Sequence, residues 1–255
     1  METTRKVKIK KIKGNVFETE DEVAVEYDLV IYINGNYFVT LLCTPINLED
    51  LVAGYLYSEG VILKGKELLN LKIDEGKRRA DAEISREDIF KYSGDRLLGE
   101  MTVTTACGKG RKVIYPVVRE GADSKITSVD IDAEKTSDLF RQFNKSSELF
   151  DRTGGVHSCA LCSQSEILIF RDDIGRHNAL DKILGKAMLQ GLDVSDKIVL
   201  TTGRMSSEIV EKVALRGIPV LVSRSAPTDT AIEKAKKAGV KLIGFLRGNR
   251  MNIYT

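Results

Sequence analysis

The sequence predicts an α/β protein with a β-rich N-terminal part and a C-terminal domain built on a mainly parallel sheet. Residues 22–42 are rich in Val, Ile, Tyr, Phe and Thr in near alternation, which is the period of a strand. From residue 166 onward, strand candidates alternate with helical patterns three times, as in a layered α/β domain. We therefore expect a β-rich domain over residues 1–125, a helical connection over 126–150 and an α/β domain over 151–255.

In the first half, the turn signal Asn34-Gly35-Asn36 divides residues 22–42 into a hairpin with about ten residues in each arm. A helix should follow, because Asn47 suits the N-cap position and the next apolar residues share one helical face as far as residues 59–60. The other elements expected here are short edge strands at 69–73 and 79–85 and a helical pattern over 124–150.

In the second half, Gly217 and Gly239 each fall between a helical pattern and a strand pattern, where a left-handed helix C-cap is expected. The expected elements are, in order, a buried strand at 166–171, a helix at 178–190, a strand at 197–201, a helix at 206–215, a strand at 219–223, a helix at 228–238 and a strand at 241–246.

Composition excludes several classes of protein. The 255 residues are 42% hydrophobic and 30% charged, as in soluble globular proteins, and 39 basic against 37 acidic residues leave a net charge of only +2. This balance argues against a general nucleic-acid binder. No stretch approaches the ~20 apolar residues of a membrane span, and four cysteines are too few for a disulfide-stapled secreted scaffold. We expect a cytoplasmic protein with reduced thiols that binds neither membrane nor nucleic acid.

Arginine-containing turns follow all four strands expected in the second half. The carboxyl ends of parallel strands meet at one sheet edge, where ligands collect. Guanidinium groups, hydroxyls and glycines suit phosphate oxygens, so the four turns together predict a phosphorylated, nucleotide-containing ligand. Each turn alone is more often a solvated loop, and Ser206 and Thr228 could be simple N-caps. The turns cover residues 171–178, 201–208, 223–228 and 245–250.

The two histidines allow competing interpretations. The spacing His157-x-Cys159-x-x-Cys162 is compatible with a zinc site, but it supplies three donors where zinc takes four, and the acid/base Glu of a zinc deaminase is absent two residues after His157. The alternative is that both cysteines are small apolar residues on a helix that starts after Gly155. His177, at a helix start, could donate to a phosphate or tie its loop together.

Cys107 is the strongest candidate nucleophile. It lies between small residues and glycines, and the cations Lys109, Arg111 and Lys112 follow it closely. Nearby cations lower the pKa of a thiol, so Cys107 could act as a nucleophile or sulfur carrier, although an inert exposed thiol fits the same pattern. Cys43 ends an apolar strand and is expected in the core.

Several motifs together resemble the formate dehydrogenase accessory sulfurtransferase family, FdhD. They are Thr-Gly-Gly-Val-His at 153–157, Asp-Ile-Gly-Arg-His-Asn-Ala-Leu-Asp-Lys at 173–182, Gly-Arg-Met-Ser at 203–206, Ser-Ala-Pro-Thr at 225–228 and Gly-Phe-Leu-Arg-Gly-Asn-Arg-Met-Asn-Ile-Tyr-Thr at 244–255. The resemblance implies a protein that carries persulfide sulfur from a cysteine desulfurase to the molybdenum bis-guanine-dinucleotide cofactor for formate dehydrogenase. It also implies a C-terminal cytidine-deaminase-like α/β/α domain without deaminase chemistry. We expect the protein to be a homodimer.

By the same resemblance, Cys107 holds the persulfide, and the cofactor is bound as a substrate without a metal of the protein's own. The residues expected to bind it are Arg176, His177, Gly203, Arg204, Ser206, Ser225, Phe245, Leu246, Arg247, Gly248, Asn249 and Arg250. The chain departs from the usual Cys-x-x-Cys of the family, because Gly110 stands at the second cysteine position. Two rivals follow: a cofactor-binding chaperone that transfers no sulfur, and a zinc hydrolase that uses His157, Cys159 and Cys162.

Overall fold

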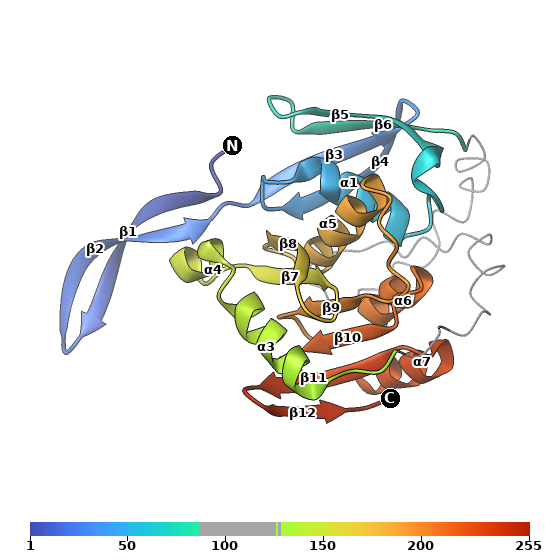
Figure 1. Ribbon diagram of the computed structural model, residues 1–255. Helices are drawn as coiled ribbons and strands as arrows, with labels where there is room; N and C mark the ends of the chain where they lie inside the picture. Colours follow the sequence, from blue (N-terminus) through green and yellow to red (C-terminus); the bar gives the residue numbers. More distant parts are fainter. Residues whose placement is uncertain (87–125, 127–128) are drawn as a thin grey trace.

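The computed structural model describes residues 1–86, 126 and 129–255, and it confirms the α/β class. The expectations for Cys107 and its neighbours fall outside the described residues. The described chain forms two sheets with helices between and beside them, and a two-stranded ribbon that extends from the body (Figure 1). Among the described residues, no helix is long and apolar enough to cross a membrane.

The ribbon consists of β1 (Thr4–Lys13) and β2 (Asn15–Ala24), which pair antiparallel around Gly14. The predicted hairpin is confirmed with shorter arms, β3 (Tyr27–Ile33) and β4 (Asn36–Cys43). Asn34 and Gly35 both have positive φ at its turn, as an Asn-Gly turn requires. Residues 22–24, expected in the first arm, belong instead to β2.

The N-terminal sheet has the strand order β4-β3-β6-β5, with β5 (Leu68–Asp74) and β6 (Arg79–Ile84) close to their predicted bounds. The prediction of two edge strands was half wrong, because β6 lies inside the sheet, parallel to β3 and antiparallel to β5. A short 3-10 turn, η1 (Gly65–Glu67), precedes β5. Helix α1 (Leu48–Ser58) buries Leu51, Val52 and Leu56 against this sheet. Asn47 occupies the N-cap position, but its side chain makes no capping hydrogen bond.

The second sheet has the strand order β12-β11-β10-β9-β7-β8. Its strands are β7 (His157–Cys162), β8 (Ile167–Asp173), β9 (Ile198–Thr201), β10 (Val220–Ser223), β11 (Lys241–Arg247) and β12 (Arg250–Ile253). Strands β9, β10 and β11 are mutually parallel, and β8 runs in the same direction, because β7 is antiparallel to both β8 and β9. The sheet is therefore mixed rather than mainly parallel, but the four strands expected to point one way do so.

Helices cover both faces of this sheet (Figure 1). One face packs on α5 (Arg176–Leu189), α6 (Ser207–Leu215) and α7 (Asp229–Ala238), with Val199 in the core between them. The other face packs on α3 (Ala133–Asn144), with Leu200 in that core. The helical pattern predicted over 124–150 is thus two helices, α3 and the short α4 (Glu148–Thr153). Gly217 and Gly239 have positive φ at the ends of α6 and α7, as expected.

Candidate functional site

The carboxyl ends of β9, β10 and β11 and the turns beside them are joined by hydrogen bonds at one edge of the sheet. The Ser223 hydroxyl donates to the carbonyl of Gly203 (2.7 Å), and the Ser225 hydroxyl donates to the carbonyl of Thr202 (3.0 Å). The amide of Phe245 donates to the carbonyl of Ser225 (3.3 Å). Three of the four predicted turns therefore form one connected structure.

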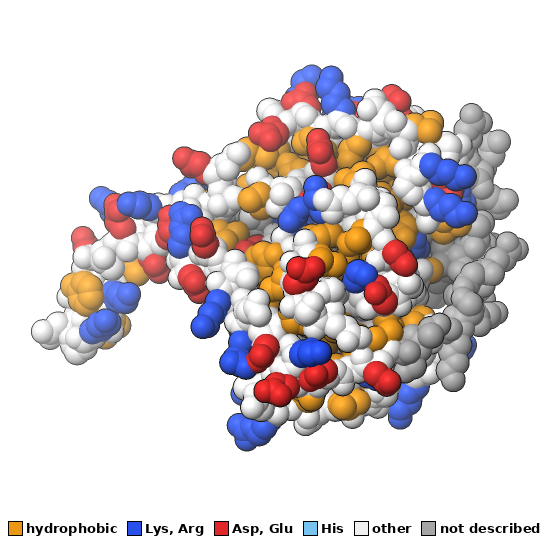
Figure 2. Space-filling view, in the orientation of Figure 1, with side chains coloured by type: hydrophobic (Ala, Val, Ile, Leu, Met, Phe, Trp, Pro, Cys, Tyr) orange, Lys and Arg blue, Asp and Glu red, His pale blue; other side chains and the backbone are white. Residues whose placement is uncertain are grey.

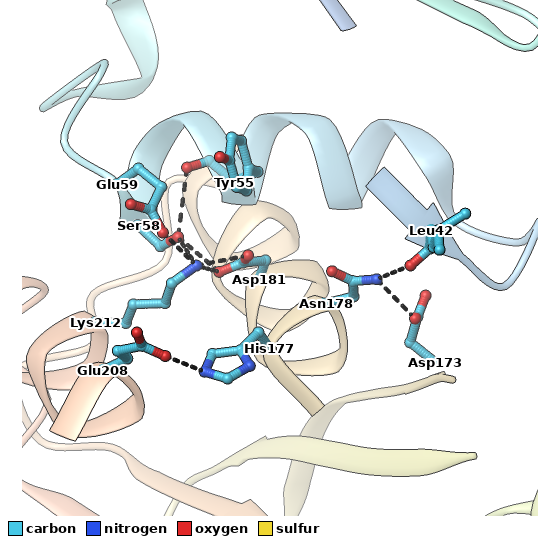
Figure 3. Close-up of polar contacts among 10 residues, drawn as sticks. All are labelled: Leu42, Tyr55, Ser58, Glu59, Asp173, His177, Asn178, Asp181, Glu208 and Lys212. Carbon is cyan, nitrogen blue, oxygen red and sulfur yellow. Dashed lines mark hydrogen bonds and ion pairs between the residues drawn. The ribbon is translucent and has the colours of Figure 1, made fainter. Parts of the chain in front are cut away.

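The turn after β8 joins the same structure through Arg176 and His177. A β-carbon on Gly203 would lie 3.0 Å from Cβ and 3.1 Å from Cδ of Arg176, so glycine makes room for the arginine stem over the β9 turn. Nε2 of His177 lies 3.2 Å from a carboxylate oxygen of Glu208 on α6 (Figure 3). The sequence predicted that His177 either meets a phosphate or ties the loop together, and the Glu208 contact favours the second role.

His157 also contributes to this edge of the sheet, although the sequence did not predict it as a binding residue. It starts β7, and because β7 runs opposite to β8–β11, its first residue lies at their carboxyl edge. Nδ1 of His157 lies 3.4 Å from the hydroxyl oxygen of Thr202, which accepts the amide of Ser158 (3.0 Å). Burial, followed by the charges of Arg176 and Arg224, lowers the pKa of His157. His157 belongs to the motif at 153–157, and its position in that motif is the sequence signal for a role at this site.

Ser206 presents a buried hydroxyl at the start of α6. It is 6% exposed, occupies the N-cap position, and its hydroxyl makes no hydrogen bond with the described part of the chain. The simple N-cap interpretation is therefore wrong for its side chain. It is correct for Thr228, whose hydroxyl accepts the amide of Ala231 (3.3 Å). A buried hydroxyl without a protein partner suits a polar ligand at this helix start.

The turn expected at 245–250 consists of the end of β11, the turn residues Gly248 and Asn249, and the start of β12, and it is divided between core and surface. Leu246 is 1% exposed and packs beneath α3, so its predicted contact with a ligand is wrong for the side chain. Phe245 is 43% exposed and has a positive φ of 53°. Arg247, Gly248, Asn249 and Arg250 are exposed as well, and so is Arg204 in the turn after β9. Arg224 lies over the ring of Phe150 (5.6 Å), which places α4 beside the same edge.

Buried charges hold the β8 turn against the N-terminal part. Nζ of Lys182 lies 2.7 Å from a carboxylate oxygen of Asp173, and both side chains are fully buried. The same carboxylate accepts the amide of Thr44 (3.0 Å), and the Asn178 amide group donates to both Asp173 and the carbonyl of Leu42 (Figure 3). These contacts hold the turn after β8 in place against the N-terminal part of the chain. Asp173, Asn178 and Lys182 belong to the motif at 173–182, but the sequence did not indicate their structural role.

The structure contradicts the zinc interpretation. Cys159 and Cys162 lie on β7, not on a helix, and they pack into cores on opposite faces of the sheet. Burial raises the pKa of each thiol to about 12, as expected for cysteines that serve as apolar core residues. Within residues 1–86, 126 and 129–255, no three His, Cys, Asp or Glu side chains cluster as metal ligands do.

The chain is similar in sequence and in structure to known proteins of one family. A sequence model of the FdhD/NarQ family matches residues 24–255. The sulfur carrier protein FdhD of Listeria innocua is 38% identical, with 100% of this chain and 98% of the relative covered; that of Bacillus licheniformis is 40% identical, with 99% and 95% covered. A crystal structure described as a formate dehydrogenase accessory protein from Desulfotalea psychrophila superimposes with a TM-score of 0.80 over 100% of this chain and 97% of that one. At 24% identity, that match supports the fold alone.

Proposed function

This chain belongs to the FdhD/NarQ family, and on that premise we propose that it is a sulfur carrier for formate dehydrogenase. Cys107 accepts sulfur from the persulfide of a cysteine desulfurase. The outer sulfur then passes to the molybdenum bis-guanine-dinucleotide cofactor, which is bound as a substrate. Curated relatives at 38–40% identity over nearly the whole chain bear the name sulfur carrier protein, which supports the first half of the proposal.

One observation supports the cofactor site most directly. Four turns with Arg176, Arg204, Arg224 and Arg247 converge at the carboxyl edge of β8–β11, next to the buried Ser206 hydroxyl. Guanidinium groups bind phosphate oxygens in bidentate fashion, and a helix start adds backbone amides. The paired pyrophosphate groups of a dinucleotide cofactor match this set. Two acidic groups near the site already have partners, since Asp173 pairs with Lys182 and a carboxylate oxygen of Glu208 lies 3.2 Å from Nε2 of His177.

The sulfur step needs a thiolate and no external oxidant. The Cys107 thiolate attacks the outer sulfur of the desulfurase persulfide, so one S–S bond forms while another breaks and the desulfurase cysteine leaves as a thiolate. Lys109, Arg111 and Lys112 supply positive charge that favours the Cys107 thiolate. The S–S bond of the Cys107 persulfide then breaks with its electron pair on Cys107, which regenerates the thiolate. The outer sulfur passes to molybdenum as a sulfane atom and becomes sulfide by taking two electrons from the reduced metal of the bound substrate.

Mass spectrometry tests the transfer. After incubation with a cysteine desulfurase and free cysteine, the wild-type chain should gain ~32 Da at Cys107, the mass of one sulfane atom. Cys107→Ala should gain nothing and should fail to support formate dehydrogenase, whereas Cys43→Ser should still accept sulfur, because Cys43 is buried. If the Cys107→Ala chain still accepted sulfur and supported formate dehydrogenase, the assignment would be wrong.

Guanine-nucleotide titration tests the binding site separately. Arg204→Ala removes an exposed guanidinium at the site and should weaken GDP binding about tenfold, the equivalent of about 1.4 kcal/mol. Arg141→Ala is the matched control, since Arg141 is exposed on α3, where it pairs with Asp138. Equal GDP affinity of both variants and the wild type would exclude this edge as the nucleotide site.

Gly110, at the position of the second cysteine of the family's Cys-x-x-Cys, is compatible with the alternative that the protein is a cofactor-binding chaperone. A single cysteine in this segment leaves no adjacent thiol to relay sulfur. A chaperone that only presents the cofactor would bind GDP in the same way but would work without Cys107. The two tests above separate the alternatives. A chaperone would bind GDP with the affinity that the sulfur carrier has, but its Cys107→Ala variant would still support formate dehydrogenase.

A further inference from the structure

Asp172, a further acidic residue at the carboxyl edge of the sheet, has a carboxyl group that is only partly satisfied. It is the penultimate residue of β8, and its Oδ2 accepts the hydroxyl of Ser147 (2.8 Å). Its Oδ1 is buried and has no hydrogen-bond partner within residues 1–86, 126 and 129–255. Burial raises the pKa of Asp172, although the hydroxyls of Ser158 and Ser147 act in the opposite direction. A buried acceptor without a donor is costly, so it requires an explanation.

Other acidic groups of the chain have cations close to them. On the face in Figure 2, acidic and basic side chains are intermixed. The buried Asp173 pairs with Lys182, whereas the same ammonium group donates only to the backbone carbonyl of Asp172 (3.1 Å). An unpaired carboxylate beside a phosphate site repels the phosphates. Asp172 therefore suits a part of the ligand that donates hydrogen bonds and has no negative charge.

Asp172 and the helix starts at this edge lie on opposite sides of the sheet. Neighbouring residues of a strand point to opposite faces, and Asp173 faces Lys182 of α5, so Asp172 faces α4. The buried Ser206 hydroxyl lies after β9, at the start of α6. In the sheet, β7 separates β8 from β9, which makes the distance between them about 10 Å. Phosphates held at α5 and α6 thus leave the ring system of a nucleotide near Asp172.

The side chains beside Asp172 suit a flat ring. Ser147, which holds Oδ2, also accepts the amide of Phe150 (3.0 Å), so one serine connects the carboxyl group to this aromatic residue. The guanidinium of Arg224 lies 5.6 Å from the centre of the half-buried Phe150 ring. Aromatic rings and guanidinium planes are common stacking partners of nucleobases. The α4 side of the edge therefore provides a stacking surface next to a hydrogen-bond acceptor.

We propose that Asp172 selects the aminopyrimidinone edge of the cofactor, in which a ring N–H and an adjacent amino group donate side by side. Guanine and the pterin of the cofactor both have this edge. A carboxylate offers two acceptor oxygens to the two donors, whereas adenine presents a ring acceptor at the same place. The inference rests on the function proposed above and adds the group that recognises the ring system.

Calorimetric titration with four nucleoside diphosphates tests the selection. The wild-type chain should bind GDP about tenfold or more tightly than IDP, which lacks the amino group, and than ADP, because a site built for a donor rejects an analogue without it. Asp172→Asn should weaken GDP binding about tenfold and should prefer XDP, because the asparagine amide donates to the carbonyl that replaces the amino group in xanthine. Asp138→Asn, which changes an exposed acid on α3, is the control and should keep the wild-type order.

Two further measurements separate recognition of the ring edge from phosphate binding and from folding. Inorganic pyrophosphate should bind equally to the wild-type chain and to Asp172→Asn. Phe150→Ala should weaken all four nucleotides by a similar factor and keep their order, since stacking does not read the ring edge. Binding of XDP by Asp172→Asn shows that this variant is folded.

Neopterin, a pterin without a nucleotide, distinguishes the two sources of the edge. Neopterin that displaces GDP from the wild-type chain would show that the site accepts either ring, and no displacement would restrict it to guanine. The inference is wrong if GDP, IDP and ADP bind equally and neopterin binding does not depend on Asp172, or if Asp172→Asn keeps the wild-type order. In those cases GDP still binds and the proposed function stands. If neither GDP nor pyrophosphate binds, the proposed cofactor site itself is wrong.

Discussion

A β-carbon on Gly185 of α5 would lie 2.5 Å from the backbone nitrogen of Gly54 on α1. The two helices therefore cross with their backbones in contact, which only glycine permits at these positions. Because α1 packs on the N-terminal sheet and α5 opens with Arg176 and His177, this crossing joins the N-terminal sheet to the helix that carries two residues of the candidate site.

Gly185→Ala and Gly54→Ala should each destabilise the protein by about 3 kcal/mol or more, because the helices must separate to admit a methyl group. Urea denaturation measures this loss. Gly76→Ala is the control, since a β-carbon there would lie 3.5 Å from its nearest neighbour, an ordinary contact with the side chain of Asp74. Alanine variants as stable as wild type would mean that the helices are not this close.

Lys182→Met should destabilise the protein by about 3–5 kcal/mol, because it leaves the Asp173 carboxylate buried without its cation. Lys186→Met lies one helical turn further along α5 and should have little effect, since Lys186 is not fully buried. Thermal unfolding of both variants makes the comparison. A small loss in Lys182→Met would argue against the buried pair that holds the β8 turn in place.

The sequence predicted the part of the site that depends on strand ends. Four turns were placed at one sheet edge from the strand–helix alternation alone, and Ser225 and Gly203 do lie there in one hydrogen-bonded structure. The local sequence pattern was sufficient to predict these turns, because the apolar residues of a strand and those of the helix after it recur with different periods. The position of Leu246 in the core was not visible, because a strand that continues past its neighbours still alternates between core and surface.

Two elements escaped sequence reasoning for physical reasons. The segment 157–162 is a buried central strand, but its small residues and cysteines have no period that separates strand from helix. The β1–β2 ribbon has charged residues where a core strand would have apolar ones, so strand pairing is invisible without knowledge of the cross-strand partners. The first error comes from the absence of a local period, and the second from cross-strand pairing, which single-sequence patterns do not encode.

Thiol labelling should distinguish Cys107 from the other three cysteines. Burial raises the pKa of Cys43, Cys159 and Cys162 to about 12, so these three should resist alkylation in the native protein at mildly alkaline pH. One thiol should react quickly, and four should react after denaturation. Native Cys107→Ala should then have no fast thiol. A fast thiol that survives this substitution would identify another reactive cysteine and weaken the sulfur-carrier proposal.

His157 should titrate below its usual pKa of 6.5, mainly because of burial and then because of Arg176 and Arg224. Its folded pKa is lower than its unfolded pKa, so stability is full above about pH 6.5 and falls as the pH drops from there toward the folded pKa. Arg224→Gln should move the pKa upward, which histidine NMR titration would detect. Arg78→Gln, in the N-terminal sheet, should leave it unchanged. An unshifted His157 in the wild type would contradict the cationic surroundings described here.

Ser206 and Thr228 occupy equivalent N-cap positions, so replacing each by alanine separates a ligand role from a capping role. Thr228→Ala should cost about 1 kcal/mol of unfolding free energy, because the hydroxyl that accepts the Ala231 amide is lost. Ser206→Ala should cost less, since its hydroxyl caps nothing in the described chain. In GDP titration the order should reverse. Ser206→Ala should weaken binding about fivefold, the equivalent of one hydrogen bond of about 1 kcal/mol, while Thr228→Ala should bind as the wild type does. If Ser206→Ala lost stability and kept its affinity, its hydroxyl would serve the fold and not the nucleotide.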